Sequence, residues 1–385
     1  MVPERLLRQL EARAQKGTLR KLTVPASGLI DFSSNDYLGL KSSEVLAQAI
    51  AAELGSTPAH GAAGSRLLSG NTTYAEELEE ELAAFHGAEA ALLFNSGYAA
   101  NVGFFSAVPQ RGDTIFYDEA SHASIKEGIR LSFAQSFPFR HNDLEDLQQK
   151  LKRAQGDVYV AVESLYSMDG DFAPLPELVT LCQEKGLYLV VDEAHSNGLY
   201  GSKGEGLVSA LHLEEKVFAR IMTFGKAVGT HGAAVVGPKV LQQFLLNFSR
   251  PFIYTTALPL ASLVSIRQAY RLLPGLTEER TIVHQLVETY QTSLQTKGIF
   301  LPLSEKQPYN SPIQAWPLAD PVALRALSNQ LQTSGFDVRP VFSPTVPVGK
   351  ERLRLVLHAF NTSAQVEELC TLLTQHSPKD ISLLA

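Results

Sequence analysis

A single lysine, Lys226, stands among small residues and glycines in the stretch TFGKAVGTHG (223–232). Apolar runs precede and follow this stretch, so the amine is expected at the edge of a hydrophobic interior. It is not a Walker A loop, because Arg220 stands where that motif needs glycine and Ala227 where it needs Ser or Thr. Burial favours a neutral amine, which can form a Schiff base with an aldehyde. The alternative is an ordinary solvated lysine in a loop.

An acidic residue ends another apolar run, in the stretch VVDEAH (190–195). Asp192 follows LYLVV so closely that its carboxylate is expected to point inward, and His195 follows three residues later. A buried carboxylate needs a cationic partner or several hydrogen bonds. The alternative is an acidic cap on the next helix. Together with Lys226, the pattern favours pyridoxal phosphate (PLP), which needs a lysine for its aldehyde and an acid for its pyridinium nitrogen.

The phosphate of such a cofactor also needs donors. The stretch NSGYAAN (95–101) joins a strand to a helix, and the backbone N–H groups of Gly97 and Tyr98 would lie at the helix N-terminus, where phosphate binds well. The hydroxyl of Thr223 could add a donor, and His122 could stack on the pyridine ring. An ordinary helix start and a satisfied polar histidine are the alternatives.

A pair of arginines could bind a carboxylate. In SPTVPVGKERLRLVLH (343–358), strand alternation places Arg352 and Arg354 on one face. A guanidinium can hold a carboxylate through two parallel hydrogen bonds, as an amino-acid substrate would require. The alternative is that both arginines lie on an exposed face of the strand.

The elements that would position these residues alternate between strands and helices. Five stretches each begin with an apolar run and end in polar or glycine residues: 89–101, 113–124, 157–171, 187–198 and 219–226. Such strands are typical of a mostly parallel sheet covered by helices, in an α/β fold whose ligand crevice lies beyond the carboxyl ends of the strands. The stretch 72–87 predicts a helix with a capping box from Thr73 to Glu76.

A smaller α+β domain is expected towards the C-terminus. A long helical pattern (261–298) leads into short strands, and Thr362 and Gln365 open a last helix. We expect an N-terminal helix and arm (1–37), a large domain (38–270) and a small domain (271–385) joined by the arm.

Composition restricts the class of protein. The 385 residues are 45% hydrophobic and 19% charged, and the formal net charge of −7 gives no electrostatic reason to expect nucleic acid or an anionic membrane as partner. No apolar run reaches transmembrane length, and the charged N-terminal stretch resembles neither a signal nor a transit peptide. Cys182 and Cys370 have no metal-ligand spacing, so no metal is expected, and the cytoplasm is the expected compartment.

With these residues in place, the chain resembles the α-oxoamine synthases over nearly its whole length. The matching motifs, in order, are DFSSNDYLGL (31–40), GSRLLSGN (64–71), LLFNSGYAAN (92–101), DEASHAS (118–124), ESLYSMDGDFAPL (163–175), VVDEAHSNGLYG (190–201), TFGKAVGTHGAAVVG (223–237), FIYTTALP (252–259) and PTVPVGKERLRL (344–355). The resemblance implies the PLP-dependent type I fold, with a seven-stranded, mostly parallel sheet in the large domain.

The resemblance also implies catalytic roles. Lys226 would bind the cofactor aldehyde and later act as the base at the substrate Cα. Asp192 would pair with the pyridine nitrogen and His195 with the phenolic oxygen of the ring. His122 would stack on the ring and could serve as an acid catalyst.

Further contacts are implied for cofactor and substrate. The cofactor contacts are Ser167 near the ring oxygen, Gly97, Tyr98 and Thr223 at the phosphate, and Thr255 or Thr256 at the phosphate of the neighbouring subunit, in a homodimer with shared active sites. The substrate contacts are Arg354 at the amino-acid carboxylate, Asn35 and Thr345 lining the site, and Arg20 at the carboxylate of the acyl chain.

Within the family, the likeness is greatest to members that condense L-alanine with a pimeloyl thioester, on coenzyme A or acyl-carrier protein, in biotin biosynthesis. Members that use glycine or serine, such as 2-amino-3-ketobutyrate CoA ligase, 5-aminolevulinate synthase and serine palmitoyltransferase, are the alternatives. An aminotransferase and a non-catalytic partner subunit are more distant ones.

Overall fold

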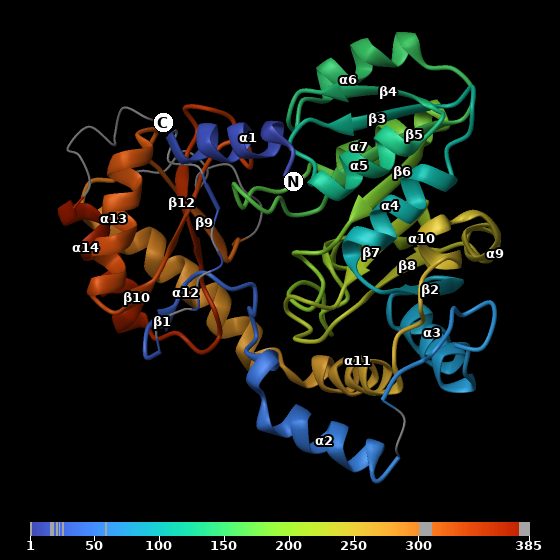
Figure 1. Ribbon diagram of the computed structural model, residues 1–385, viewed down its shortest axis with the longest axis horizontal. Coiled ribbons are helices and arrows are strands. Elements are labelled where there is room, and N and C mark those ends of the chain that lie inside the picture. The colour runs from blue at the N-terminus through green and yellow to red at the C-terminus, as the bar shows by residue number, and fades with distance from the viewer. Residues whose placement is uncertain are drawn as a thin grey trace.

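The larger lobe of the molecule is built on one sheet. The computed structural model describes residues 2–15, 19, 20, 22, 24, 27–57, 60–299 and 310–376. Among them, a seven-stranded sheet has the order β2-β8-β7-β6-β5-β3-β4 (Figure 1). Its strands are β2 (Ala90–Phe94), β3 (Thr114–Asp118), β4 (Gln135–Phe139), β5 (Val158–Glu163), β6 (Tyr188–Asp192), β7 (Ala219–Thr223) and β8 (Ala233–Gly237). β8 is antiparallel to both neighbours and the other pairs are parallel, which confirms the expected fold class.

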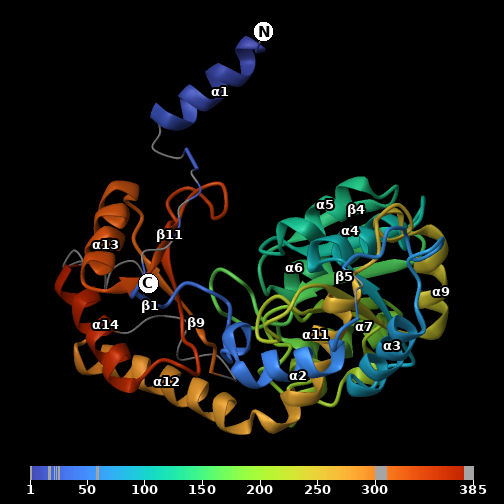
Figure 2. The ribbon, with the colours of Figure 1, turned by 60° about the horizontal axis from the view of Figure 1, so that its bottom comes forward.

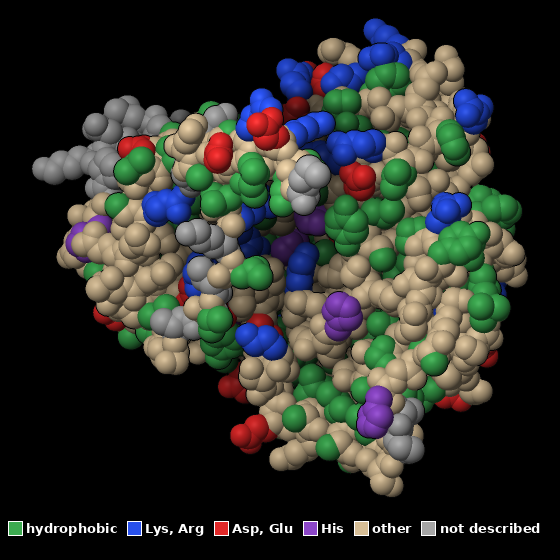
Figure 3. Space-filling model, viewed as in Figure 1, with side chains coloured by type: hydrophobic (Ala, Val, Ile, Leu, Met, Phe, Trp, Pro, Cys, Tyr) green, Lys and Arg blue, Asp and Glu red, His purple; other side chains and the backbone are tan. Residues whose placement is uncertain are grey.

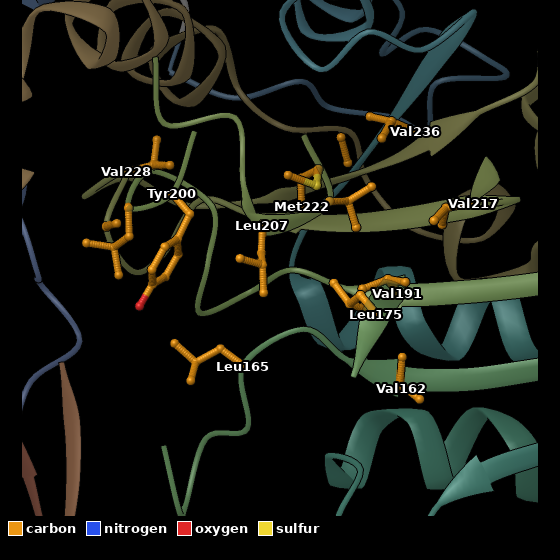
Figure 4. Packing of buried hydrophobic residues seen from close by; sticks show 14 of the residues in the cluster. Val162, Leu165, Leu175, Val191, Tyr200, Leu207, Val217, Met222, Val228 and Val236 are labelled. Carbon is orange, nitrogen blue, oxygen red and sulfur yellow. The ribbon is translucent and has the colours of Figure 1, made fainter. Parts of the chain in front are cut away.

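Helices cover both faces of this sheet, which explains why its central strands are apolar on both sides. One face packs on α4 (Gly97–Ala107), α5 (Ala123–Leu131), α9 (Lys239–Phe248) and α10 (Arg250–Ile253). The other face packs on α3 (Thr73–Phe85), α7 (Leu175–Lys185) and α11 (Leu260–Leu272), and α2 (Glu44–Leu54) lies against α11. Figure 4 shows Val162, Val191 and Met222 of successive strands within this second core.

The smaller lobe has its own sheet and core. β9 (Ile313–Pro317), β12 (Arg352–Val356) and β11 (Arg339–Val341) form an antiparallel sheet beside α12 (Thr277–Thr296), α13 (Pro321–Thr333) and α14 (Ser363–His376). The fully buried Trp316 is the largest side chain of its core. From the expected N-terminal arm, β1 (Ile30–Asp31) pairs in parallel with β10 (Phe336–Asp337), so this strand of the arm belongs to the smaller lobe.

Two sequence predictions on helices need correction. The helical pattern over 261–298 is not one helix: α11 ends at Leu272, and a short 3-10 turn at Leu273–Gly275 separates it from α12. Pro274 and Gly275 lie in this turn, and both residue types disfavour a continuous helix. The cap of α3 is Thr72 rather than Thr73, because Thr72 Oγ1 accepts the N–H of Ala75.

The last helix begins as expected. The backbone N–H of Thr362 donates to Gln365 Oε1, and the N–H of Gln365 donates to Thr362 Oγ1. At the opposite end of the chain, α1 (Glu4–Gln15) buries no residue and extends away from both lobes (Figure 2). Within the described part of the chain, no helix combines the length and apolar character needed to span a bilayer.

Candidate active site

Polar side chains meet where the central parallel strands end. β5 ends at Glu163, β6 at Asp192 and β7 at Thr223, and Glu163 is the register partner of Asp192. All three are buried. Lysine or arginine and histidine side chains gather in the hollow between the two lobes (Figure 3). Ionisable and polar side chains are therefore concentrated in the crevice beyond the carboxyl ends of the strands, where sheets of this class bind their ligands.

Lys226 lies in the turn that follows β7. The N–H of Phe224 donates to Gly232 O over 3.0 Å, and the N–H of Gly229 donates to Lys226 O over 2.8 Å. Gly229 has a φ of +69°, and a Cβ there would lie 2.6 Å from Leu40 Cβ, so this turn requires glycine. The turn fixes the backbone of Lys226 at the sheet edge.

The Lys226 amine is partly buried. Its Nζ lies 2.8 Å from His195 Nε2. Burial lowers the pKa of Lys226 to about 8, and the negative charge of Asp192 acts in the opposite direction. A substantial neutral fraction at neutral to mildly basic pH makes this amine a competent nucleophile and base.

Asp192 is 4% exposed and accepts two hydrogen bonds. Asn101 Nδ2 donates to its Oδ2 over 2.6 Å, and the backbone N–H of Ala194 donates to Oδ1 over 2.9 Å. These donors come from α4 and from the chain just after β6, so the carboxylate is held at a fixed orientation.

His195 connects Lys226 to the N-terminal arm. Its Nδ1 lies 2.6 Å from the hydroxyl of Tyr37, which is fully buried. Burial, reinforced by the charge of Lys226, holds the pKa of His195 well below its ordinary value. The ring is therefore neutral and relays hydrogen bonds between the two side chains.

The N-terminus of α4 lies against Thr223. Ser96 caps the helix by accepting the N–H of Ala99, and a Cβ on Gly97 would lie 2.4 Å from Thr223 Cγ2. Glycine therefore allows the helix N-terminus to lie against the methyl group of Thr223, while the Thr223 hydroxyl donates to Ala194 O over 3.4 Å. Tyr98 follows on the exposed first turn, 51% accessible. Such a combination of amides and a hydroxyl suits a phosphate.

His122 is the N-cap of α5. Its Nδ1 accepts the backbone N–H of Ser124 over 3.2 Å and lies 2.7 Å from Ser124 Oγ. The backbone N–H of His122 donates to Glu163 Oε1 over 2.6 Å. The ring thus has a fixed anchor on one edge while the residue as a whole is exposed.

Both arginines of β12 are buried, so the exposed-face alternative does not hold. Arg354 Nε donates to Ser167 O over 2.6 Å, and its Nη2 donates to Asn35 Oδ1 over 2.8 Å. Arg352 forms an ion pair with Asp169. Both arginines of the small lobe therefore hold the loop after β5, which belongs to the large lobe.

The remaining predicted residues lie in two further places. Arg20 Nη2 donates to Thr345 Oγ1 over 3.2 Å, which brings together two predicted substrate contacts that are far apart in sequence. Asn95 Nδ2 donates to Thr255 Oγ1 and to Thr256 O, each over 3.0 Å. Both threonines therefore lie next to the residue that precedes the cap of α4 in their own chain.

Comparison with known proteins assigns the family. A model described as aminotransferase class I and II matches residues 27–373. The chain belongs to this family. It is 42% identical, over 94% of its length and 92% of the relative, to the 8-amino-7-oxononanoate synthase of Emericella nidulans. The resemblance to the α-oxoamine synthases is thereby confirmed.

Solved structures of this family superpose over nearly the whole chain. The serine palmitoyltransferase of S. paucimobilis, with a bound PLP–myriocin aldimine, has a TM-score of 0.88 at 27% identity and covers 98% of both chains. The 8-amino-7-oxononanoate synthase of Francisella tularensis has a TM-score of 0.78 at 29% identity, over 91% of this chain and 98% of that one.

The residues at the sheet edge fit PLP. A partly buried amine at Lys226 suits the aldehyde, the fixed carboxylate of Asp192 suits a protonated ring nitrogen, and the N-terminus of α4 beside Thr223 suits the phosphate. The structural evidence for the fit is the buried carboxylate of Asp192, which two donors hold at the same sheet edge as the Lys226 amine.

Three buried residues that contact the predicted site residues were not predicted from the sequence. Asn101 holds Asp192, Glu163 holds the backbone of His122, and Tyr37 contacts His195. Glu163 ends its strand as Asp192 does, and that shared pattern was a usable signal. Asn101 and Tyr37 carry no such local signal, because their partners lie 91 and 158 residues away.

Proposed function

We propose that this chain is a PLP-dependent acyltransferase that condenses L-alanine with a pimeloyl thioester. The reaction releases CO2 and the free thiol and yields 8-amino-7-oxononanoate for biotin biosynthesis. The observation that carries the chemistry is the partly buried amine of Lys226 at the same sheet edge as the held carboxylate of Asp192. The likeness to enzymes named 8-amino-7-oxononanoate synthase supports the choice of substrates.

PLP, when bound, supplies an aldehyde that captures the amino acid and a ring that accepts electrons from its Cα. Lys226 would hold the cofactor through its aldehyde, and its amine would serve as the base for the substrate Cα proton. Asp192, held by Asn101 and Ala194, would pair with the ring nitrogen and favour its protonated form, a preorganised electrostatic effect. His195 and Ser167 would hold the phenolic oxygen of the ring, and His122 would support the ring face.

The phosphate and the substrates are bound by separate groups. The N–H groups of Gly97 and Tyr98 and the Thr223 hydroxyl bind the phosphate. Arg354 binds the alanine carboxylate, because its contacts with Ser167 and Asn35 fix the plane of the guanidinium.

Arg20 binds the free carboxylate of the pimeloyl chain. Its hydrogen bond to Thr345 supports this role, since the contact anchors the long side chain of Arg20 to the loop before β12. The acyl chain would then extend from the sheet edge towards the N-terminal arm.

We also propose a cytoplasmic homodimer with shared sites, in which Thr255 or Thr256 reaches the phosphate in the neighbouring subunit. Light scattering reports the dimer. Mixing Lys226→Ala subunits with Thr255→Val/Thr256→Val subunits tests the sharing. One of the two sites in a mixed dimer would carry both native groups, so activity should return on mixing; no recovery would count against shared sites.

A substrate panel tests the function. The purified protein with PLP is incubated with alanine, glycine or serine and with pimeloyl-CoA, pimeloyl-acyl-carrier protein or palmitoyl-CoA, and products are identified by mass spectrometry. We expect 8-amino-7-oxononanoate from alanine and a pimeloyl thioester, with the other pairs at least about tenfold slower. Preferred turnover of glycine or serine, or transfer of the amino group to a keto acid, would reject the assignment.

A further inference from the structure

A continuous chain of hydrogen bonds joins His122 to Asp192. His122 Nδ1 lies 2.7 Å from Ser124 Oγ, Asn101 Nδ2 donates to the same oxygen over 3.0 Å, and Asn101 Nδ2 also donates to Asp192 Oδ2 over 2.6 Å. The two linking residues, Ser124 on α5 and Asn101 on α4, are each 1% exposed. The chain therefore runs entirely through the interior, behind the candidate site.

The direction of every hydrogen bond in this chain is determined. A carboxylate only accepts, so Asn101 must present its NH2 group to Asp192, and the other hydrogen of that group goes to Ser124 Oγ. The Ser124 hydroxyl is then free to donate its own hydrogen to His122 Nδ1. The backbone N–H of Ser124 donates to the same nitrogen over 3.2 Å.

Because His122 Nδ1 accepts the backbone N–H of Ser124, it carries no proton. The single ring proton of a neutral imidazole must then reside on Nε2. If Nδ1 were protonated, its N–H would point at the backbone N–H of Ser124, and the two donors would repel each other. The Ser124 hydroxyl would also lose its acceptor. Both effects oppose the charged form of the ring.

We infer that Asn101 and Ser124 are positioning residues that hold His122 as a neutral imidazole with its N–H on Nε2 and couple it to Asp192. The inference rests on the proposed function, which gives His122 a cofactor ring to stack on. A neutral ring avoids repulsion with a protonated pyridine ring, and a fixed Nε2–H provides a donor to the reacting groups.

Other charges act on His122 from the surrounding elements. Partial burial of the ring, on the side that faces Ser124, is the largest influence and lowers the pKa of His122. Asp192 on β6 acts in the opposite direction, and Lys226 after β7 and Lys126 on α5 lower the pKa further. Glu163 on β5 accepts the backbone N–H of His122. His195 also faces this ring. The hydrogen-bond chain therefore acts in the same direction as burial.

Two variants interrupt the chain at different points, and one serine provides a matched control. Ser124→Ala removes the hydroxyl donor to His122, and Asn101→Ala removes the link to Asp192. Ser121, in the same loop, is 2% exposed, and its Oγ has no hydrogen-bond partner among the described residues. Ser121→Ala therefore removes a buried hydroxyl without touching the chain.

The experiment is nitrogen-15 NMR of histidine-labelled holoenzyme, in which the His122 signal is assigned by its loss in His122→Asn. We expect the Nε2–H tautomer and a titration below the ordinary histidine range in the wild type. In Ser124→Ala and Asn101→Ala the pKa of His122 should rise by about one unit, with no change in Ser121→Ala. The acid limb of kcat/KM should move in parallel.

A His122 proton on Nδ1 in the wild type, or a titration that Ser124→Ala and Asn101→Ala leave unchanged, would overturn the inference. The tautomer of His122 in the wild type tests the inference even if a variant does not fold. Failure of the proposed function is a separate result, because it would appear as no turnover with any amino acid and thioester. The NMR measurement of the His122 tautomer and pKa does not depend on turnover, so it would still test the inference.

Discussion

The amine of Lys226 lies 2.8 Å from Nε2 of His195, and the other ring nitrogen of His195 lies 2.6 Å from the Tyr37 hydroxyl. A neutral imidazole has one donor and one acceptor nitrogen. When Lys226 donates to Nε2, Nδ1 carries the proton and donates to Tyr37. The neutral imidazole of His195 thus positions the Lys226 amine by a hydrogen bond. Because this partner carries no charge, the amine is not held in an ion pair and remains available as a nucleophile.

Arg354→Lys should weaken binding of the amino acid. Lysine keeps the charge but loses the planar fork that Ser167 and Asn35 orient, so KM for alanine should rise by about 10- to 100-fold with a smaller change in kcat. Arg352→Lys is the control, because it preserves a cation opposite Asp169, and it should change KM by less than about threefold. Equal effects of the two substitutions would refute the assignment of Arg354.

Gly97→Ala should weaken cofactor binding by about 10- to 100-fold, because the added Cβ would lie 2.4 Å from Thr223 Cγ2 and displace the N-terminus of α4. Thr223→Ser removes that methyl group and retains the hydroxyl. The double variant should therefore recover most of the affinity in a fluorescence titration with PLP. If the double variant binds no better than Gly97→Ala, steric contact is not the cause.

Glu163→Gln should change how stability depends on pH. Burial, reinforced by Asp192, raises the pKa of Glu163 to about 8, so between about pH 4.5 and 8 the folded protein keeps a proton that the unfolded chain has lost. The free energy of unfolding of the wild type must then fall as pH rises through this range. Glutamine still accepts the His122 N–H but does not titrate.

Relative to the wild type, Glu163→Gln should therefore gain about 3 kcal/mol between pH 5 and pH 7.5. Denaturant unfolding of both proteins in the same cofactor state at the two pH values measures the difference. A difference that does not depend on pH would mean that Glu163 is ionised throughout.

Arg20→Ala should raise KM for the pimeloyl thioester by about tenfold and leave KM for alanine unchanged. An octanoyl thioester, which has no terminal carboxylate, should be insensitive to the substitution. Arg8→Ala on α1 is the matched control, because Arg8 forms only an exposed ion pair with Glu4. Equal losses with pimeloyl and octanoyl substrates would show that Arg20 does not bind the carboxylate.

The sequence predicted the positions of site residues that stand at the end of a recognisable strand or helix pattern. Asp192 and Lys226 follow apolar strands, and the strand register brings these sheet ends together, so their positions in the fold followed from periodicity alone. The capping pair Thr362 and Gln365 was also visible locally. The family resemblance, rather than the pattern, supplied the roles of Arg20 and Thr345.

Other features depend on packing between distant segments. The cap of α3 at Thr72 and the break between α11 and α12 depend on one or two residues at element ends, where periodicity is a weak guide. Asn101 reaches Asp192 only because α4 packs across the parallel strands. The burial of Arg352 likewise depends on a loop of the other lobe, which supplies Asp169.

The most direct test of the account is to locate the covalent bond to the cofactor. The holoenzyme is reduced with borohydride and digested, and the modified peptide is sequenced by mass spectrometry. We expect a phosphopyridoxyl group on Lys226, with neither this label nor the visible cofactor absorbance in Lys226→Ala. A label on another lysine, or turnover retained by Lys226→Ala, would contradict the central claim that this partly buried amine carries the chemistry.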